Sequence, residues 1–428
     1  MKKLSSALAV MAVLGFSVQA NAAGYQLTEY STTGLGRSFA GAGLVGDDYS
    51  AIAYNPAGMS YTTRSGAQLG FSTVGIRSTA KGTAGTTSGK ESPYIVRVLP
   101  HGFAQYRLND RTVLGLGIYT PFGLATDYKN GWFGKTHAGR SEIQTVNVSP
   151  ALSVNVTDSV ALGASVNLQH ARAKLTSEVE KFGQYLGGKT YLRGHDTSLG
   201  YTLGATWEPV KNKTRLGVSY RSKVVQDLRG KNTVSDASNL QLPLGPGGSL
   251  VSVPVNGTKN IKTKITTPET VTLSAWQRLT DKWSVSATAR WTRWSQFKDL
   301  NIYYDEPHPE THSTVASATH EHWRNTWFYA LGADYQYCKN LIFRFGGAYD
   351  QSVVKGPEYR TARIPDGRRI WTSLGFSYMK NNWQLDGGYA HLFVKDVKAR
   401  HKSEGMSDFD AKYSSNANLF SLAVQYKF

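Results

Sequence analysis

The sequence predicts an all-β protein: a transmembrane antiparallel β-barrel of about 14 strands, with an N-terminal plug (a hatch) inside its lumen. Apolar side chains alternate with polar or small ones in many segments, as in strands with lipid on one side and water on the other. Short polar turns alternate with long connections along the chain. Beyond the first 22 residues, no run approaches the roughly 18 consecutive apolar residues of a membrane-spanning helix, which excludes a helical inner-membrane protein.

Residues 1–22 have the pattern of a secretory signal peptide. Lys2 and Lys3 give a charged start, an apolar run of roughly a dozen residues follows, and Ala20-Asn21-Ala22 has the small residues of a cleavage site. The alternative, a retained transmembrane anchor, is disfavoured because the apolar run is too short to cross a bilayer. We therefore expect an exported chain whose mature form begins at Ala23.

Residues 23–63 are predicted to form the plug. The segment is rich in Gly, Ser, Thr and Ala, and it has no sustained helical or strand periodicity. It nevertheless carries apolar residues such as Leu35, Phe39 and Ile52, which are too many for a solvated tail. An irregular backbone of this kind needs polar partners from outside, and the inner wall of a barrel can provide them.

Residues 64–428 are predicted to form the outer-membrane barrel. Period-two alternation is clearest in the last strand, where the apolar set is Phe420, Leu422, Val424, Tyr426 and Phe428. Similar alternation occurs in residues 160–169, 283–291 and 341–350. Because Phe428 resembles the terminal aromatic by which outer-membrane barrels are recognised, the barrel-assembly machinery is an expected partner.

The lengths of the connections set the expected topology. Six short turns contain Asn or Asp, which tolerate turn conformations, at residues 108–111, 156–158, 210–213, 279–282, 338–340 and 380–382. Seven long connections alternate with them, at residues 77–92, 122–140, 175–193, 230–262, 298–320, 351–367 and 396–415. This alternation requires about fourteen strands, with the short turns and both termini in the periplasm and the long loops outside. The expected location is the outer membrane of a Gram-negative bacterium.

The formal charge of +18 would suggest a nucleic-acid partner in a soluble protein, but an exported barrel has other uses for it. We expect outer-membrane lipid and lipopolysaccharide as the anionic partners of most basic residues, with an anionic ligand in the lumen as the alternative. No nucleic acid is expected. Cys338 is the only cysteine, so it forms no internal disulfide and is interpreted as an inert thiol near a turn.

Two short motifs interrupt the regular pattern. In Asn55-Pro56-Ala57 the proline restricts Asn55 to an extended conformation, and the Asn55 amide can tie the plug to the wall; an ordinary Asn-Pro turn is the alternative. Thr120-Pro121-Phe122-Gly123 follows Gly115 and Gly117 at the end of the third strand, where proline and glycine favour a bulge or kink. The alternative is that this motif only begins an outer loop.

Several motifs occur in an order that is informative as a set. They are Ala23-Gly24-Tyr25-Gln26-Leu27, Gly34-Leu35-Gly36-Arg37, Asn55-Pro56-Ala57, Thr120-Pro121-Phe122-Gly123-Leu124-Ala125-Thr126, Tyr220-Arg221-Ser222, Trp294-Ser295-Gln296-Phe297, Tyr349-Asp350-Gln351-Ser352 and Ile364-Pro365-Asp366. In this order, from plug to last strand, they resemble the FadL/TodX family of outer-membrane transporters for hydrophobic compounds. The resemblance implies a fourteen-stranded barrel, an N-terminal hatch, and passive uptake of long-chain fatty acids or aromatic hydrocarbons. It also implies a lateral opening near Gly123, through which substrate leaves sideways into the membrane.

The resemblance further implies a carboxylate-binding residue at Arg324, since arginine can bind a carboxylate through two hydrogen bonds. The second basic residue of the family pattern is missing, and Ser177 occupies the matching position. Arg172 and Lys174 are the candidate substitutes. A charge at a strand end, within a lumen network, is the alternative role for Arg324.

Further ligand contacts are expected in the lumen and at the outer end of the barrel. Tyr25, at the start of the plug, is expected to contact substrate in the lumen. Leu124, Tyr128, Trp132 and Phe133 are predicted to form an apolar cluster outside the bilayer. This cluster is either a capture groove for substrate or simple loop packing.

No metal, cofactor or enzymatic activity is predicted. His308, His312, His320 and His322 lie close together in the sequence, but no companion spacing matches a known metal motif, so solvated loop histidines are the preferred interpretation. Neither a nucleophile elbow nor a phosphate-binding loop occurs. The favoured function is passive uptake of long-chain fatty acids, followed by uptake of aromatic hydrocarbons by the same route, and then by an enzyme or an adhesin built on a barrel.

Overall fold

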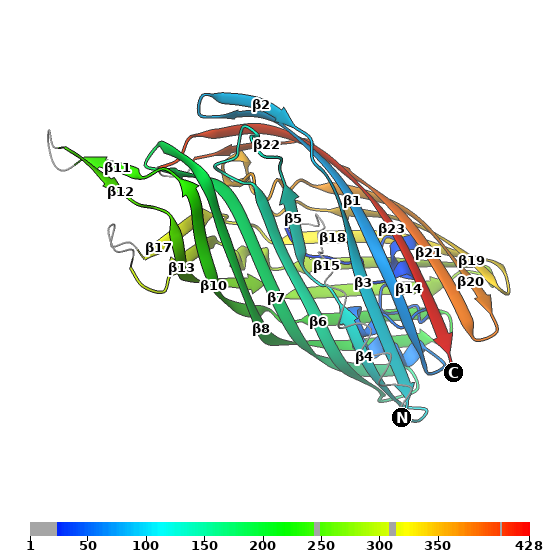
Figure 1. Ribbon diagram of the computed structural model, residues 1–428. Helices are drawn as coiled ribbons and strands as arrows, with labels where there is room; N and C mark the ends of the chain where they lie inside the picture. The colour runs from blue at the N-terminus through cyan, green and yellow to red at the C-terminus, as the bar shows by residue number, and fades with distance from the viewer. Residues whose placement is uncertain (1–23, 244–248, 308–313, 403–404) are drawn as a thin grey trace.

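The structure, a computed structural model, describes residues 24–243, 249–307, 314–402 and 405–428. Its strands join into one closed antiparallel barrel of 14 wall strands, as the sequence predicts (Figure 1). In chain order the wall consists of β1 (Gly66–Ala84), β3 (Tyr94–Arg107), β4 (Thr112–Tyr119) with β5 (Gly123–Asp127), β6 (Arg140–Asn155), β7 (Val160–Lys181), β8 (Gln184–Val210), β9 (Thr214–Arg221) with β10 (Val224–Ala237), β13 (Gly257–Thr267) with β14 (Thr270–Arg278), β15 (Trp283–Thr292) with β16 (Asp299–Tyr304), β17 (Val315–His320) with β18 (Thr326–Cys338), β19 (Leu341–Asp350), β20 (Arg369–Lys380), β21 (Trp383–Val394) with β22 (Val397–His401), and β23 (Phe409–Lys427). The barrel closes between its first and last strands, β1 and β23, in register from Gly66–Lys427 to Ala84–Phe409.

The two ends of the barrel differ in the length of their connections. All six short turns lie where the sequence predicts them, each between two consecutive wall strands. At the opposite end several strands extend well beyond the rest of the wall, together with the small strands β2 (Thr87–Glu91), β11 (Leu240–Pro243) and β12 (Leu250–Val253) (Figure 1). We call the short-turn end periplasmic and the other end outer.

Several of the long outer connections consist partly of strand, and two show this most clearly. β1 continues to Ala84 and pairs with β2, and β7 and β8 form a hairpin whose turn lies between Lys181 and Gln184. Strands that leave the lipid keep their ladder hydrogen bonds but no longer need an apolar face. The period-two signal therefore ends before the strands do.

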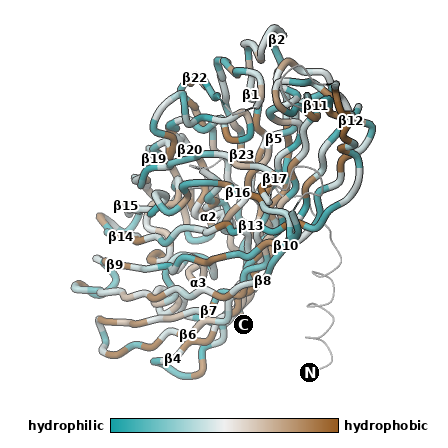
Figure 2. The backbone as a smooth tube through the Cα atoms, turned by 90° about the vertical axis from the view of Figure 1, so that its left-hand side faces the viewer, coloured by the Kyte–Doolittle hydropathy of each residue, from teal (hydrophilic) through white to brown (hydrophobic). Residues whose placement is uncertain are grey.

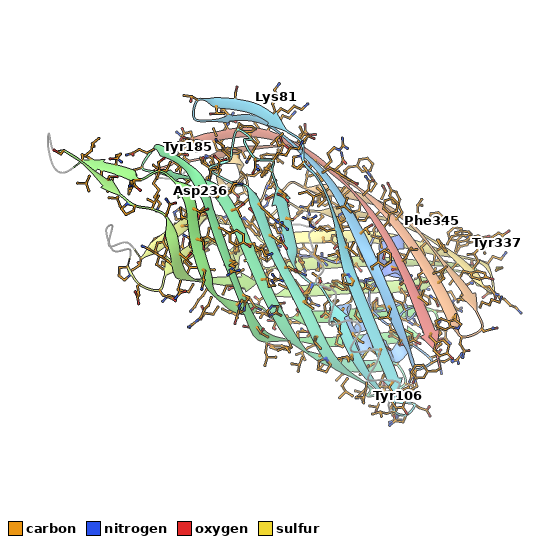
Figure 3. The ribbon with its side chains drawn as sticks, in the orientation of Figure 1. Lys81, Tyr106, Tyr185, Asp236, Tyr337 and Phe345 are labelled. Atoms are coloured by element: carbon orange, nitrogen blue, oxygen red, sulfur yellow. The ribbon has the colours of Figure 1, made fainter. Side chains whose placement is uncertain are left out.

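The predicted lipid-facing side chains lie on the outside of the wall. Leu162, Val166 and Leu168 of β7 are about half exposed, and so are the alternating apolar residues of β23. Tyr106 and Tyr337 are exposed near the periplasmic end, whereas Lys81, Tyr185 and Asp236 mark the outer end (Figure 3). The inner faces of the same strands carry buried polar residues, which is the pattern of a membrane barrel with a filled lumen.

The plug lies inside the barrel, as predicted. It contains α2 (Thr32–Gly36), α3 (Ala51–Tyr54) and the 3-10 helix η1 (Pro56–Tyr61), and wall strands surround α2 and α3 (Figure 2). Ser31 caps α2 by accepting a hydrogen bond from the Gly34 amide at 2.8 Å. Within the described residues, no helix has the length and apolar character needed to cross a membrane.

Candidate functional site

Five aromatic side chains meet in the outer half of the lumen and form what we call the aromatic cage: Tyr25, Phe122, Trp294, Phe297 and Trp323. All are buried, and the Tyr25 ring lies at the centre, with its centroid 4.7 Å from that of Trp294 and between 5.7 and 5.9 Å from those of the other three. The Tyr25 hydroxyl donates to the Thr266 carbonyl oxygen at 3.1 Å. The start of the described chain thus fills an apolar chamber made by the wall.

Interruptions in three wall strands supply the cage. Trp294 belongs to η2 (Trp294–Gln296), which separates β15 from β16, and Trp323 lies in residues 321–325, which separate β17 from β18. Phe122 lies between β4 and β5. A residue that leaves the strand conformation is free of the strict alternation between faces, so bulky rings from neighbouring segments can converge inside. Aliphatic residues, among them Leu124, Ile143 and Val353, continue the same apolar cluster around the cage.

The third wall strand is kinked at Thr120-Pro121-Phe122, where the sequence predicts it. β3 pairs with β4 only from Gly102–Ile118 to Arg107–Val113, whereas β5 pairs with β6. Among the described residues, no strand pairs with the edge of residues 94–101 of β3 that faces β5. The ladder is therefore interrupted between the outer parts of β3 and β5, and we call this place the wall gap.

The first residues of the plug pair with the kink beside the wall gap. The Leu27 amide donates to the Pro121 carbonyl oxygen and the Gly123 amide donates to the Tyr25 carbonyl oxygen, both at 2.8 Å. Gln26 and Phe122 form a bridge of the antiparallel type. On the other side of the kink, Phe122 is hydrogen-bonded to Thr145 of β6. The same plug segment that carries Tyr25 into the cage thus also covers the unpaired edge of the kink.

A cavity of about 170 Å³ lies on the outer side of the cage. It shares Leu192 and Tyr304 with the apolar cluster and is also lined by Ser177 and Arg363. Arg363 is partly buried in the segment between β19 and β20, where its Nη1 donates to Ser141 Oγ at 3.1 Å and to the Thr176 carbonyl oxygen at 3.2 Å. Burial lowers the pKa of Arg363 to about 10, so the guanidinium stays charged at neutral pH. Arg363 thus places a guanidinium with fixed hydrogen bonds beside the apolar cluster, in a cavity whose lining also includes charged side chains.

The basic residues that the resemblance implies point elsewhere. Arg324 is exposed, and its Nε donates to the Ser352 carbonyl oxygen at 2.9 Å. Arg172 is exposed on the outer face of β7, because Ala171 and Leu175 occupy the inner face and belong to the apolar cluster. Lys174 is two residues after Arg172 in the same strand, so both side chains lie on the same face of the strand. Their assignment as ligand contacts stays a prediction. The cations that line the cavity are Arg363 and Lys181, and the carboxylates of Glu178 and Glu180 line it as well.

The outer aromatic residues form a cluster of their own. Trp132 stacks on Tyr128 with ring centroids 3.8 Å apart, and Phe133 stacks on Phe409 at 5.8 Å. Trp132 and Phe133 are only 5% exposed, so they offer little open surface for capturing a substrate. Leu124, which the sequence groups with them, belongs to the apolar cluster of the cage instead. Of the two interpretations left open, loop packing describes this arrangement better.

Asn55-Pro56-Ala57 ties the plug to the wall. The Asn55 amide nitrogen donates to the carbonyl oxygens of Ala205 and Val218, each at 3.2 Å, and its side-chain oxygen accepts from the Ala57 amide at 3.1 Å. The wall has no side chain at this point, since residue 204 is glycine, and a Cβ on Gly204 would collide with the Asn55 side-chain oxygen. The glycine lets the plug reach the backbone of β8 and β9, whose ladder carbonyls accept the Asn55 amide. Whether this contact has a role in transport stays a prediction.

A buried charge network holds the periplasmic part of the plug. Arg37 contacts Asp47 at 2.7 Å and Asp334 at 2.9 Å, and Arg344 contacts the same two carboxylates at 2.9 and 3.3 Å. Arg37 and Asp47 come from the plug, whereas Asp334 and Arg344 come from β18 and β19. Two cations and two anions balance in this plug–wall network, a condition for burying charge without a large penalty.

Sequence reasoning did not find Trp294, Trp323, Arg363 or the plug–wall network. In Trp294-Ser295-Gln296-Phe297, two aromatic residues in a break between strands are a usable sign of an inward contact. Arg363 had no such sign, because it lies in a long connection with no periodicity. The network joins residues about 300 positions apart, such as Arg37 and Asp334, and only the closed barrel brings them together.

Comparisons with known proteins agree with this geometry. A family model described as outer membrane protein transport protein (OMPP1/FadL/TodX) matches residues 13–428. The chain is 28% identical to the long-chain fatty acid transport protein of Escherichia coli O6:H1, over 99% of this chain and 98% of the relative. It is also 28% identical to outer membrane protein P1 of Haemophilus influenzae, over the full length of both.

Solved structures show the same fold. The crystal structure of a Pseudomonas aeruginosa FadL homologue is 25% identical, with a TM-score of 0.83 over 95% of this chain and 100% of that chain. The Pseudomonas putida toluene transporter TodX is 17% identical, with a TM-score of 0.71 over 94% of this chain and 99% of that chain, and shares the fold alone. With the family match extending over nearly its whole length, the chain belongs to the OMPP1/FadL/TodX family of non-enzymatic transporters that carry hydrophobic compounds across the outer membrane of Gram-negative bacteria.

Proposed function

We propose that this protein takes up long-chain fatty acids passively, binding them in the outer half of the lumen and releasing them sideways through the wall gap. The observation that carries the proposal is the continuity between the two places. Phe122, in the kink, contacts Tyr25 in the cage, and Leu124 of β5 belongs to the same apolar cluster. A ligand that replaces Tyr25 would find apolar side chains from the cage to the edge of the gap.

The physical reason for a sideways exit is the free energy of an acyl chain. Each buried CH₂ stabilises the chain in an apolar site by about 0.8 kcal/mol. Release into periplasmic water forfeits that stabilisation, whereas release into the hydrocarbon of the bilayer retains it. Downhill transfer from the cage through the wall gap therefore needs no energy source.

The plug start is the element that has to move. Tyr25 fills the cage, and the two 2.8 Å backbone hydrogen bonds of Tyr25 and Leu27 hold the same segment against the kink. A ligand ring or acyl chain that displaces Tyr25 pulls on these hydrogen bonds. Occupation of the cage and uncovering of the gap are coupled in this way through three consecutive residues.

The head group is the part of the substrate that distinguishes the candidates. Arg363 provides a charged guanidinium in the cavity beside the cage, which favours a fatty-acid carboxylate over a neutral hydrocarbon. Uptake of aromatic hydrocarbons by the same route is the second candidate, because the cage itself consists of five aromatic rings. An adhesin built on the outer strands is disfavoured, because it needs neither a plug nor a cage.

Two further partners complete the proposal. Phe428 is exposed and its amide is hydrogen-bonded to the Ser65 carbonyl oxygen, so the terminal aromatic stands free at the periplasmic rim for the barrel-assembly machinery. Lipid and lipopolysaccharide are the partners of exposed basic residues such as Arg172 at the outer end.

The position that tests the route is Gly123, where a Cβ would lie 3.0 Å from Leu27 Cδ1, at the junction of kink and plug. Alanine fits after a small shift of the flexible Leu27 side chain. We expect Gly123→Ala to transport normally and Gly123→Trp to lose nearly all uptake of radiolabelled oleate by whole cells, while oleate binding to the purified protein persists. Normal uptake by a folded Gly123→Trp variant would overturn the lateral route.

A further inference from the structure

Three potential metal ligands meet at the outer end of the wall, although they are not adjacent in the sequence. His320 Nδ1 lies 2.7 Å from Asp299 Oδ1, and His322 Nε2 lies 4.0 Å from the same oxygen. One ligand atom from each of the three residues falls within 4.8 Å of the others. Within the described ranges, no other group of three His, Cys, Asp or Glu ligand atoms comes this close.

The backbone explains why both histidines face the same side. Asp299 of β16 is directly opposite His320 of β17 in the ladder. The next two amides, those of Glu321 and His322, both donate to the Lys298 carbonyl oxygen at 2.8 Å, and His322 has a φ of +44°. Two residues therefore oppose one, as in a β-bulge, which redirects side chains. Glu321 is buried, whereas His320 and His322 are exposed beside Asp299.

The spacing suits a small tetrahedral cation. Bonds of about 2.0–2.1 Å to imidazole nitrogen and carboxylate oxygen place ligand atoms roughly 3.3 Å apart around a tetrahedral Zn²⁺. The two distances to Asp299 Oδ1, 2.7 and 4.0 Å, bracket that value, so modest side-chain rotations bring the three atoms into place. Imidazole nitrogens together with one carboxylate favour Zn²⁺ over Mg²⁺ or Ca²⁺, which prefer oxygen ligands alone.

We propose that Asp299, His320 and His322 form an outer-surface site for Zn²⁺ or a similar divalent transition metal, with water as the fourth ligand. The side chains of His320 and His322 are 72% and 47% exposed, so the cation reaches them directly from the medium. The sequence did not predict the site because its carboxylate is supplied by another strand, 21 residues before His320. The neighbouring His308 and His312 lie outside the described residues.

The site has a structural connection to the lumen. His322 is followed by Trp323 of the cage, and the Trp323 Nε1 donates to Glu321 Oε2 at 2.9 Å. A cation that joins Asp299 to both histidines crosslinks β16 to residues 321–325. We therefore expect the bound metal to rigidify this segment as well as to occupy the surface.

The direct test is metal binding by the purified, untagged protein in detergent. A fluorescent zinc indicator is used as the competitor in a Zn²⁺ titration, and the wild type should bind one Zn²⁺ per chain. Loss of an outer-shell partner alone usually costs about tenfold or more in metal affinity, so removing two ligands in His320→Ala/His322→Ala should weaken binding by at least that factor. The matched control is His170→Ala/His195→Ala, which removes another exposed pair whose rings are 6.1 Å apart but which lacks a third ligand in place; it should bind as the wild type does.

A second measurement separates a defined site from loose binding to surface histidines. Zn²⁺ should slow backbone hydrogen exchange in residues 321–325 of the wild type, and Asp299→Asn should abolish that protection while the barrel stays folded, as shown by its heat-dependent migration on gels. Equal Zn²⁺ affinity in the wild type and His320→Ala/His322→Ala would overturn the proposal. So would the absence of Zn²⁺ binding by the wild type, or loss of binding in the His170→Ala/His195→Ala control alone.

Discussion

The periplasmic and outer halves of the lumen are filled by different kinds of interaction. In the periplasmic half the plug is held by polar contacts: the four charges of the plug–wall network and the Asn55 amide on two wall carbonyls. In the outer half the plug contributes one aromatic ring to a cage of four others. The plug is thus held by buried charge pairs at one end, and at the other by apolar contact together with backbone hydrogen bonds to the kink.

This difference indicates which end is built to open. A buried ion pair resists separation because each isolated charge loses its compensation, and no hydrophobic substrate can replace it. An aromatic ring in an apolar cage is replaceable, because another apolar group of similar volume makes equivalent contacts. We therefore expect the periplasmic half to seal the barrel against polar solutes and the outer half to exchange Tyr25 for a ligand.

The largest effect is expected from breaking the plug–wall network. Arg344→Ala leaves two buried carboxylates with one arginine, and removing one partner of a buried pair typically costs about 3–5 kcal/mol. We expect the plug to loosen and the barrel to leak. The measurement is single-channel conductance in planar bilayers, together with the sensitivity of cells to a polar antibiotic too large for general porins.

The double variant Arg344→Ala/Asp334→Ala is the matched control. It removes one charge of each sign from the wall and leaves Arg37 with Asp47 in the plug, 2.7 Å apart. Its conductance should be closer to that of the wild type than to that of Arg344→Ala. Equal leakage by both variants would show that lost packing, not unbalanced charge, loosens the plug.

A smaller effect is expected from a change in the aromatic cage, where ligand binding should improve while the seal against ions is kept. Tyr25→Ala removes a fully buried ring, whose burial is worth about 1.5–3 kcal/mol, and leaves space between Trp294 and Trp323. Because the ligand no longer has to displace the ring, oleate should bind more tightly to the purified protein, while the conductance to ions stays low. Tyr25→Phe keeps the ring and loses only the bond to Thr266, so it should behave nearly as the wild type does. Weaker oleate binding by Tyr25→Ala would mean that the ring is a ligand contact and not an obstacle.

The two halves also differ in how far the sequence predicts them. The wall was predictable because lipid on one side and a polar lumen on the other impose period two on every strand, as in Phe420 to Phe428. The kink at Pro121 and the plug contact of Asn55 were predictable because proline restricts the backbone locally and glycine weakens a strand. The aromatic cage and the plug–wall network depend on which strands face each other across the lumen. Nothing in the sequence next to Trp323 or Asp334 indicates that arrangement. Arg324 was expected inside from its resemblance, but the alternation around it puts Trp323 inside and Arg324 outside.

The smallest predicted effect concerns the head group of the substrate. Arg363→Gln removes one of the two cations that line the cavity, while Arg324→Gln removes one that is exposed and bonded to the Ser352 carbonyl oxygen. A hydrogen bond to a charged group contributes about 1.5 kcal/mol at the low end, appropriate for a partly exposed site, or roughly tenfold in affinity. We expect Arg363→Gln to weaken oleate binding by about that factor and to leave the binding of a neutral alkane unchanged. Arg324→Gln should change the binding of neither ligand.

If Arg324→Gln instead weakens the binding of oleate alone, the head group binds at the outer surface beside β18. If neither variant discriminates between the two ligands, the carboxylate is not recognised and a hydrocarbon is the better substrate. Each result assigns the head group by comparing a cation that lines the cavity with one that is exposed.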